Sequence, residues 1–344
     1  MPATLGDKKL PLLVNANQEN KVKKIRWAIA GTSFISEVMA KAIQSSDTGE
    51  LIAISSRSIS SATAFAEKFS IPHAYDDYQH LLNNPDIDAI YIGLPNYLHK
   101  ACIIHAAQAG KHVLCEKPFV VNTKDADEVK TFVENANVLC MEALMYRYHP
   151  FIKKLKSLID SGIIGEIKLY TATYTANIAD VANPTDGGAI LSLGCYPVSL
   201  VRLLANAEPT EIIGIGRCNA KNNNDHQASV ILKFPNDAIA TISTADDMAM
   251  RWQFDIHGTE GHLKIITNPW LPTENNHIVI QKNNDEQLIE MNICADKPLY
   301  TYQIDAMGNI ITHNHSFLHH DEISLADSAE NAAVLEAWLK QVKC

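Results

Sequence analysis

The sequence lacks an excess of basic residues, and it has no long apolar run. Its 344 residues include 29 lysines and arginines against 39 aspartates and glutamates, a formal net charge of -10. Because nucleic-acid affinity comes largely from neutralised phosphates, this balance argues against a DNA or RNA partner, although it is compatible with a small anionic cofactor. No segment approaches the roughly 18 consecutive apolar residues of a membrane helix, and the early run LPLLV is shorter than the roughly 7 to 15 residues of a signal-peptide core. We therefore predict a cytoplasmic protein without a membrane partner.

Paired cysteine motifs and common hydrolase motifs are also missing. The chain has an odd number of cysteines and no C-x-x-C pair: Cys102, Cys115, Cys140, Cys195, Cys218, Cys294 and Cys344. This pattern predicts reduced, mostly buried thiols rather than a disulfide or zinc framework. The histidines at 313, 315, 319 and 320 lack carboxylates or cysteines at ligand spacing, so we predict a solvated loop and no metal. Neither G-x-S-x-G nor H-E-x-x-H occurs, which disfavours a triad hydrolase or a zinc peptidase.

The chain is long enough for two domains, and its pattern changes once along its length. Residues 1–23 are polar and Asn-rich, which predicts a flexible arm. Residues 24–142 alternate short apolar strands with helical segments, which predicts an α/β Rossmann domain with a doubly wound parallel sheet. Residues 143–344 contain a long helical block followed by alternating strands. They predict an α+β domain with a large, mostly antiparallel sheet for substrate binding and oligomerisation.

The stretch GTSFIS, directly after the apolar run IRWAIA, lies where a dinucleotide-binding turn is expected. Glycines in such a turn provide a tight bend, close approach of the backbone to pyrophosphate, and close packing of helix on strand. Gly31 fills the first position, whereas Ser33 and Ser36 stand at the other two. Both serines are small and can donate to phosphate oxygens. The alternative is an ordinary strand-to-helix turn with Ser33 as the N-cap.

The end of the second strand bears on the choice of cofactor. An NAD site places Asp or Glu there for the ribose hydroxyls, whereas an NADP site places a basic group there for the 2′-phosphate. This chain has Ser56 and Arg57 and no carboxylate. Arg57 can form a bidentate pair with phosphate, so NADP is favoured over NAD. The alternative is an exposed arginine without a ligand.

A buried strand in KHVLCEKPF ends at Glu116 and Lys117. Pro118 favours an extended Lys117, which directs its side chain outward at the carboxyl end of the strand. Ligands bind at that edge of open α/β sheets, and a lysine there can give or take a proton. Taken alone, this pattern favours a surface lysine.

Three longer segments carry a family resemblance: GLPNYLHKACIIHAAQAGKHVLCEKP, MEALMYRYHPFIKKLKSLIDSGIIGEI and GGAILSLGCYPVSLVRLLA. They resemble the family of glucose-fructose oxidoreductase and inositol dehydrogenase. The second half is most similar to the branch that includes dihydrodiol dehydrogenase and NADP-dependent xylose dehydrogenase. The resemblance runs from about Ile25 to the final helix.

The resemblance implies a role for each matching residue. Lys117 contacts the reacting oxygen, and Tyr196 is the general acid/base. His149 helps to shape the pocket. The predicted substrate ligands are Lys117, Arg147, Ser192 and Tyr196. The predicted cofactor ligands are Gly31, Thr32, Ser33, Phe34, Ile35, Ser56, Arg57, Leu94, Pro95, Asn96, His99, Glu116 and Lys117.

Ser192 departs from the family pattern, because most relatives carry an Asp four residues before the Tyr. If the segment is helical, Ser192 and Tyr196 share one face, so Ser192 can still exchange a hydrogen bond but supplies no negative charge. We expect an NADP-dependent oxidoreductase of a sugar or small vicinal diol, assembled as a homodimer or homotetramer. The alternatives are a reductase of keto-sugars, including nucleotide-linked ones, and a non-enzymatic NADP-binding sensor.

Overall fold

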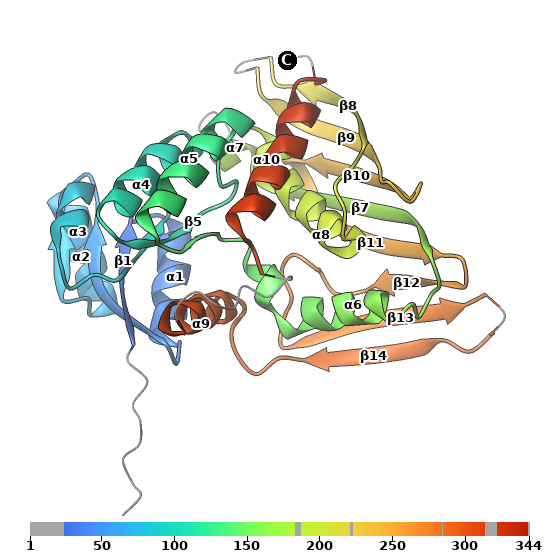
Figure 1. Ribbon diagram of the computed structural model, residues 1–344, viewed down its shortest axis with the longest axis horizontal. Coiled ribbons are helices and arrows are strands. Elements are labelled where there is room, and N and C mark those ends of the chain that lie inside the picture. The colour runs from blue at the N-terminus through green and yellow to red at the C-terminus, as the bar shows by residue number, and fades with distance from the viewer. Residues whose placement is uncertain (1–23, 183–186, 221–222, 284, 314–321, 343–344) are drawn as a thin grey trace, which may run out of the picture.

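The computed structural model describes residues 24–182, 187–220, 223–283, 285–313 and 322–342. Two sheets lie side by side, with helices between and around them (Figure 1). The predicted N-terminal arm and three of the four clustered histidines fall outside the described residues.

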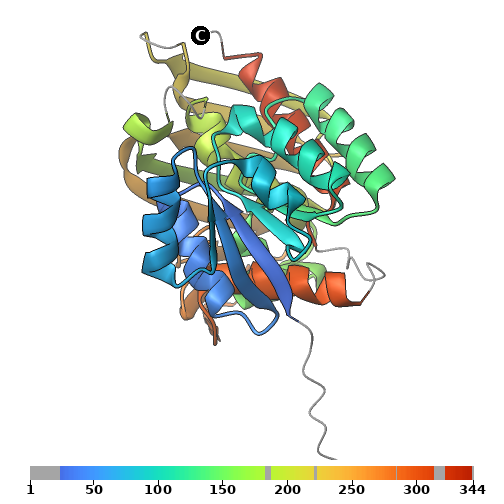
Figure 2. The same ribbon diagram turned by 90° about the vertical axis from the view of Figure 1, so that its left-hand side faces the viewer.

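The first sheet has six parallel strands in the order β3-β2-β1-β4-β5-β6. Successive residues of β1 face opposite layers: Trp27 packs with α1 and α2, whereas Ala28 packs with α4 and α5. Helices therefore cover both faces of this sheet (Figure 2). The elements are β1 (Ile25–Ala30), α1 (Phe34–Gln44), β2 (Gly49–Ser55), α2 (Ile59–Phe69), β3 (His73–Tyr75), α3 (Tyr78–Asn83), β4 (Ala89–Ile92), α4 (Asn96–Gln108), β5 (His112–Cys115), α5 (Thr123–Ala136) and β6 (Cys140–Glu142).

The strand order reverses between β1 and β4, so the carboxyl ends of these two strands open a crevice at the sheet edge. This arrangement confirms the predicted Rossmann fold.

The second sheet has eight strands in the order β14-β13-β12-β11-β7-β10-β9-β8. All its strand pairs are antiparallel except β7 with β10, which confirms the predicted mostly antiparallel sheet. The elements are α6 (Pro150–Asp160), β7 (Ile167–Asn177), α7 (Ala179–Ala182), α8 (Cys195–Ala205), β8 (Glu211–Cys218), β9 (Asp225–Lys233), β10 (Ile239–Ala245), β11 (Asp247–Gly258), β12 (Gly261–Ile265), β13 (Asn275–Lys282), β14 (Ile289–Cys294), α9 (Leu299–Thr312) and α10 (Leu325–Leu339).

The last two helices connect the sheets. Helix α9 lies beside α1 (Figure 1), where Asp305 accepts hydrogen bonds from Ser46 Oγ at 2.5 Å and from the backbone N of Asp47 at 3.0 Å. A Cβ at Gly308 would come within 2.2 Å of Thr48 Oγ1, so glycine permits this close approach. Helix α10 packs against both α5 and α8. The predicted boundary after Glu142 lies between the strands of the first sheet and those of the second. It remains a prediction, and α9, which follows the second sheet in sequence, packs against α1 and β2 of the first.

The cysteines differ from the prediction at one position. Cys102, Cys115, Cys140 and Cys195 are free and buried, and Cys294 is free and exposed. Cys218 is disulfide-bonded, so the prediction of reduced thiols is wrong there. Sequence spacing cannot reveal such a bond, because pairing depends on which Cα atoms the fold brings together. Within the described part of the chain, no helix has the length and apolarity needed to cross a bilayer, and no group of three potential ligands could hold a metal ion.

Candidate active site

The turn after β1 contains one glycine, Gly31, and packs against a second glycine, Gly93, on a neighbouring loop. Gly31 has a φ of +107°, and a Cβ there would lie 2.7 Å from the carbonyl oxygen of Gly93. Ser36 is fully buried, and its Oγ would lie 3.1 Å from a Cβ at Gly93. Gly93, on the loop after β4, has no side chain and so leaves space for the side chain of Ser36, at the position where a dinucleotide-binding turn usually has its third glycine. Ser33 is the N-cap of α1, but its side chain makes no capping bond; its Oγ lies 3.1 Å from Ser36 Oγ instead.

The end of β2 lies beside this turn. Gly31 N donates to the carbonyl oxygen of Ser55 at 2.9 Å, and Thr32 Oγ1 is 3.3 Å from Ser56 Oγ. Arg57 follows Ser56 and is exposed. The amino end of α1 carries unpaired N–H groups and the positive end of the helix dipole, so turn and strand end together suit a phosphate group. Most of the predicted cofactor ligands keep some exposed surface: Gly31, Thr32, Ser33, Phe34, Ile35, Ser56, Arg57, Leu94, Pro95, Glu116 and Lys117.

Asn96 and His99 differ, because both are buried. The ring of His99 lies between two loops, with Nδ1 2.9 Å from the carbonyl oxygen of Pro118 and Nε2 2.8 Å from that of Leu94. His99 has no exposed surface in this structure, so its predicted role as a direct cofactor ligand stays a prediction that the burial of its ring does not support. Its position in the first turn of α4 directs the ring into the protein, where it ties the loop after β4 to the loop after β5.

The loop after β5 is anchored at several points. Tyr91 Oη donates to Glu116 Oε1 at 2.7 Å, and Lys117 N donates to Glu116 Oε2 at 3.2 Å. Lys117 Nζ donates to the carbonyl oxygen of Ser192 at 2.8 Å and lies 5.2 Å from the centroid of the Tyr196 ring. The two predicted catalytic residues, which are distant in sequence, therefore meet where the two sheets face each other.

Ser192 and Tyr196 lie on a helical segment that begins as a π-helical turn, Ile190–Gly194, before it becomes α8. Such turns are frequent at functional sites. The Oγ of Ser192 is buried and has no hydrogen-bond partner among the described residues. Burial raises the pKa of Tyr196 well above its usual value, and the nearby phenol of Tyr300 adds to this effect.

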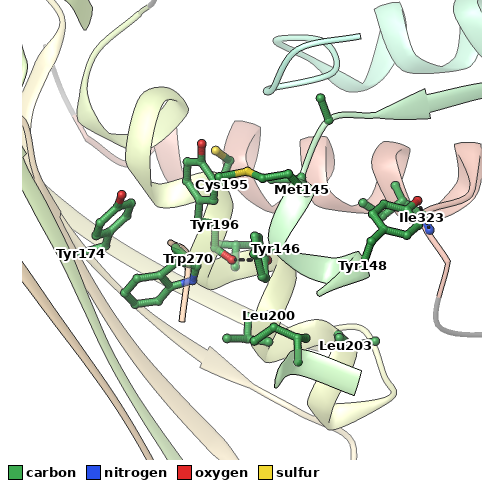
Figure 3. Close-up of a cluster of buried hydrophobic side chains, with 14 of the residues drawn as sticks. Met145, Tyr146, Tyr148, Tyr174, Cys195, Tyr196, Leu200, Leu203, Trp270 and Ile323 are labelled. Atoms are coloured by element: carbon green, nitrogen blue, oxygen red, sulfur yellow. Dashed lines mark hydrogen bonds between the residues drawn. The ribbon is translucent and has the colours of Figure 1, made fainter. Parts of the chain in front are cut away.

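Aromatic side chains surround Tyr196 (Figure 3). The ring of Tyr174, from β7, meets the Tyr196 ring edge-on at 5.6 Å and stacks at a tilt on Trp270 at 4.7 Å. Tyr146 Oη donates to the carbonyl oxygen of Tyr196 at 2.8 Å. Sequence reasoning missed Tyr174, Trp270 and Tyr300; only Tyr174 had a signal, as an inward position in the alternating strand IKLYTATYTA.

Arg147 lies outside this group. Its Nη1 donates to Ser199 Oγ at 2.8 Å and to Asp327 Oδ2 at 3.2 Å, and the residue lines a separate cavity of about 520 Å³ with Arg202 and Glu208. Its predicted contact with substrate stays a prediction that the structure does not support, because the guanidinium is buried in an ion pair with Asp327.

His149 is likewise a structural residue. Its Nδ1 accepts from Phe151 N at 3.2 Å, which caps α6, and burial lowers its pKa to about 4. The ring is therefore neutral and packs edge-on against Tyr302 at 5.2 Å, and its role in shaping the pocket stays a prediction.

A doubly wound sheet with a glycine turn at its carboxyl edge, a lysine on the loop after β5 at the same edge and a tyrosine on α8 beside that lysine define an NAD(P)-dependent oxidoreductase. The family models agree. The model described as "Oxidoreductase family, NAD-binding Rossmann fold" matches residues 25–144, and the "GFO/IDH/MocA C-terminal domain" matches residues 152–264. The chain belongs to the GFO/IDH/MocA family, which confirms the resemblance seen in the sequence.

Individual relatives cover most of the chain. An uncharacterized oxidoreductase of Rhizobium meliloti, ORF334, is 33% identical over 270 residues, 77% of this chain and 80% of the relative. The trans-1,2-dihydrobenzene-1,2-diol dehydrogenase of Homo sapiens is 28% identical over 256 residues, 73% of this chain and 77% of the relative.

Two solved structures share the fold. KijD10, a 3-ketoreductase from Actinomadura kijaniata in complex with NADP, has a TM-score of 0.82 at 24% identity and covers 93% of this chain and 98% of its own. A levoglucosan dehydrogenase in complex with NADH and levoglucosan has a TM-score of 0.82 at 18% identity and covers 93% of this chain and 97% of its own.

Proposed function

We propose that the protein is an NADP-dependent oxidoreductase that transfers a hydride between the nicotinamide and a carbinol or carbonyl carbon of a sugar or small vicinal diol. The observation that carries this proposal is the meeting of Lys117 and Tyr196, with Nζ 5.2 Å from the ring centroid, at the carboxyl edge of the first sheet. A sensor without catalytic activity would need neither residue.

The residues at the sheet edge fit a dinucleotide. The backbone at Gly31 approaches so closely to Gly93 that no Cβ is accommodated, and the amino end of α1 lies directly beyond it. The exposed Arg57 would pair with the 2′-phosphate of NADP, because its guanidinium matches phosphate oxygens in a bidentate manner. When bound, the nicotinamide supplies the hydride acceptor or donor.

The protein holds the substrate oxygen and moves its proton. Lys117 Nζ uses one N–H on the carbonyl oxygen of Ser192, which leaves two N–H donors for the oxygen of the substrate. These donors stabilise the alkoxide that develops during oxidation. Tyr196 exchanges the proton of that oxygen as the general acid/base.

The protonation state of Tyr196 bears on proton exchange in both directions. Because burial raises the pKa of Tyr196 well above its usual value, the phenol is neutral near pH 7 and ready to protonate a carbonyl oxygen. Oxidation requires this proton to leave first. The second candidate, a reductase of keto-sugars, runs the same chemistry in reverse, with Tyr196 as the proton donor.

The surroundings of Ser192 suit a neutral polar substrate. Its buried Oγ can exchange a hydrogen bond with a substrate hydroxyl, whereas no carboxylate stands at this position. Tyr174, 5% exposed, lies close by, and the fully buried Trp270 packs against it. A sugar ring or a dihydrodiol combines hydroxyls with apolar faces, which suits a site that holds the hydroxyl of Ser192 beside the edge of Tyr174.

Steady-state assays with a substrate panel test the proposal. Aldoses, inositols, dihydrodiols and keto-sugars are compared with NADP(H) and NAD(H), using the wild type, Lys117→Ala and Tyr196→Phe. We expect each variant to lose about 10²- to 10⁴-fold in kcat on the best substrate. Tyr170→Phe is the matched control, because Tyr170 is buried against the same sheet but lies outside the lysine–tyrosine pair. If both catalytic variants kept wild-type rates, the mechanism would be wrong.

The uncovered face of the second sheet supports self-association. Ile213, Ile215 and Ile231 lie on β8 and β9 and are 60%, 73% and 45% exposed. Ile213 and Ile231 are direct cross-strand partners, so these side chains form a continuous apolar surface. We propose that two copies of the chain bury this face in a homodimer, or in a homotetramer built from such pairs.

A further inference from the structure

A buried carboxyl group beside the catalytic loop has no part in the mechanism above. Glu142 ends β6, and its cross-strand partner is Cys115, the last residue of β5. Lys117 follows Cys115 by two residues. Glu142 is 1% exposed, so its side chain lies under the loop that presents Lys117.

The carboxyl group holds this loop through the backbone. Phe119 N donates to Glu142 Oε1 at 2.9 Å, which closes the loop two residues beyond Lys117. The other oxygen, Oε2, has no hydrogen-bond partner among the described residues. On the opposite side of the loop, Glu116 is held by Tyr91. The position of Lys117 thus depends on two carboxyl groups, of which Glu142 is the more deeply buried.

Opposing effects act on the pKa of Glu142. Burial raises its pKa to about 7, the N–H of Phe119 opposes this, and the carboxylate of Asp327 on α10 reinforces it. The Ser328 hydroxyl and the more distant Arg202 guanidinium on α8 lower the pKa. Three buried thiols are further titratable groups nearby: Cys140 on the strand of Glu142, Cys115 on β5 and Cys195 at the start of α8.

We propose that Glu142 is a positioning residue for Lys117, and that uptake of a proton at Glu142 loosens the Phe119 contact and slows hydride transfer as the pH falls through neutrality. A carboxylate accepts from an N–H more strongly than a neutral carboxyl group does, so protonation weakens the anchor. Displacing a catalytic group by about 1 Å can cost about 10²-fold in rate. This inference rests on the proposed role of Lys117.

Two substitutions test the hydrogen bond from Phe119 N and the charge of Glu142 separately. In Glu142→Gln the amide oxygen can still accept from Phe119 N, but the side chain no longer titrates. Because the amide is neutral like the protonated carboxyl group, we expect kcat at pH 8 to fall toward the value that the wild type reaches at pH 6, and the fall of kcat between pH 8 and pH 6 to disappear. In Glu142→Ala the anchor is lost, and we expect kcat to fall by about 10- to 100-fold at every pH while KM for NADP changes by less than about 3-fold.

The matched control is Glu336→Gln. Glu336 on α10 also accepts from a backbone N–H, that of Thr123 at 2.9 Å, but lies away from the Lys117 loop. We expect this variant to keep the wild-type pH profile. Folding of each variant is checked by circular dichroism and thermal unfolding; if Glu142→Ala does not fold, Glu142→Gln decides alone.

The outcomes are distinct. A wild-type profile that is flat from pH 6 to 8, an unchanged fall of kcat in Glu142→Gln, or wild-type kcat in folded Glu142→Ala would each overturn the inference. Loss of activity in Lys117→Ala together with any of these results would leave the proposed function intact. Full activity of Lys117→Ala would instead refute the proposed function.

Discussion

The substitution Asp225→Asn should stabilise the protein at alkaline pH and leave its stability nearly unchanged at acid pH. Asp225 begins β9 and is buried, and its Oδ2 accepts from the backbone N of Ile190 at 2.8 Å. It thereby caps the π-helical turn that carries Ser192. Gly188, with a φ of +93°, packs directly on this carboxyl group, since a Cβ there would lie 2.4 Å from Oδ1.

The magnitude follows from the pKa. Burial raises the pKa of Asp225 from its ordinary 3.8 to about 6, opposed by the N–H of Ile190 and reinforced by the neighbouring carboxyl group of Asp246. A shift of about two units corresponds to about 3 kcal/mol. Below pH 4 the carboxyl group is protonated in both the folded and unfolded states, so its ionisation does not lower the free energy of unfolding. As the pH rises through 6 the folded state must carry a buried charge, and this stability is lost.

Asparagine keeps the shape of the side chain and cannot ionise. It gives up the charge-assisted part of the bond to Ile190, a cost of about 1 kcal/mol. We therefore expect Asp225→Asn to raise the free energy of unfolding by about 2 kcal/mol at pH 8 and to change it little, or lower it slightly, at pH 4. Urea unfolding followed by fluorescence at pH 4, 6 and 8 measures both differences.

Asp305→Asn is a control of opposite sign. Burial raises the pKa of Asp305, but Lys297 Nζ at 2.7 Å and Ser46 Oγ outweigh this and hold it below its usual value. Loss of the Asp305 carboxylate should lower the free energy of unfolding most at pH 8 and less at acid pH. The reasoning about Asp225 would be refuted by a stability difference that does not vary with pH, or by one that is more destabilising at pH 8 than at pH 4.

Three further predictions concern the cofactor site and assembly. Arg57→Ala should raise KM for NADP at least about 10-fold more than KM for NAD, because it removes the 2′-phosphate partner; equal losses in steady-state assays would remove Arg57 from this role. Gly31→Ala should cost about 1–3 kcal/mol of stability in urea unfolding and weaken dinucleotide binding in fluorescence titration, since φ is +107° and a Cβ would lie 2.7 Å from Gly93 O; wild-type behaviour in both would contradict the close approach. Ile215→Glu should lower the mass measured by light scattering to that of fewer subunits, with Lys168→Glu on the same sheet as an exposed control; an unchanged mass would place the interface elsewhere.

Local patterns were sufficient for the first sheet and its edge. The alternation of apolar strands with helices predicts a parallel order, and a parallel order places the ends of β1, β2, β4 and β5 at one edge. The positions of Gly31, Arg57 and Lys117 therefore follow from local sequence, since each lies just after the end of a strand. Tyr196 required the family resemblance, because a tyrosine in an apolar helix has no distinguishing local signal.

The structure departs from the sequence-based expectation where the direction of a side chain or a long-range pairing decides. His99 lies in the expected loop region, but its ring turns inward to two carbonyl groups. Arg147 follows the expected segment, but Ser199 and Asp327 hold its guanidinium away from the catalytic pair. The disulfide at Cys218 joins residues without a sequence motif.

By itself, the sequence determined the class of fold, the edge at which a dinucleotide fits, and the lysine presented there, because these depend on periodicity and on the order of strands along the chain. Only the tertiary structure decided how Gly93 compensates for Ser36, how Ser192 offers its carbonyl oxygen to Lys117, and which buried carboxyl groups support the site. These features depend on contacts between residues that are distant in the chain, and no local pattern encodes the distance between two such residues.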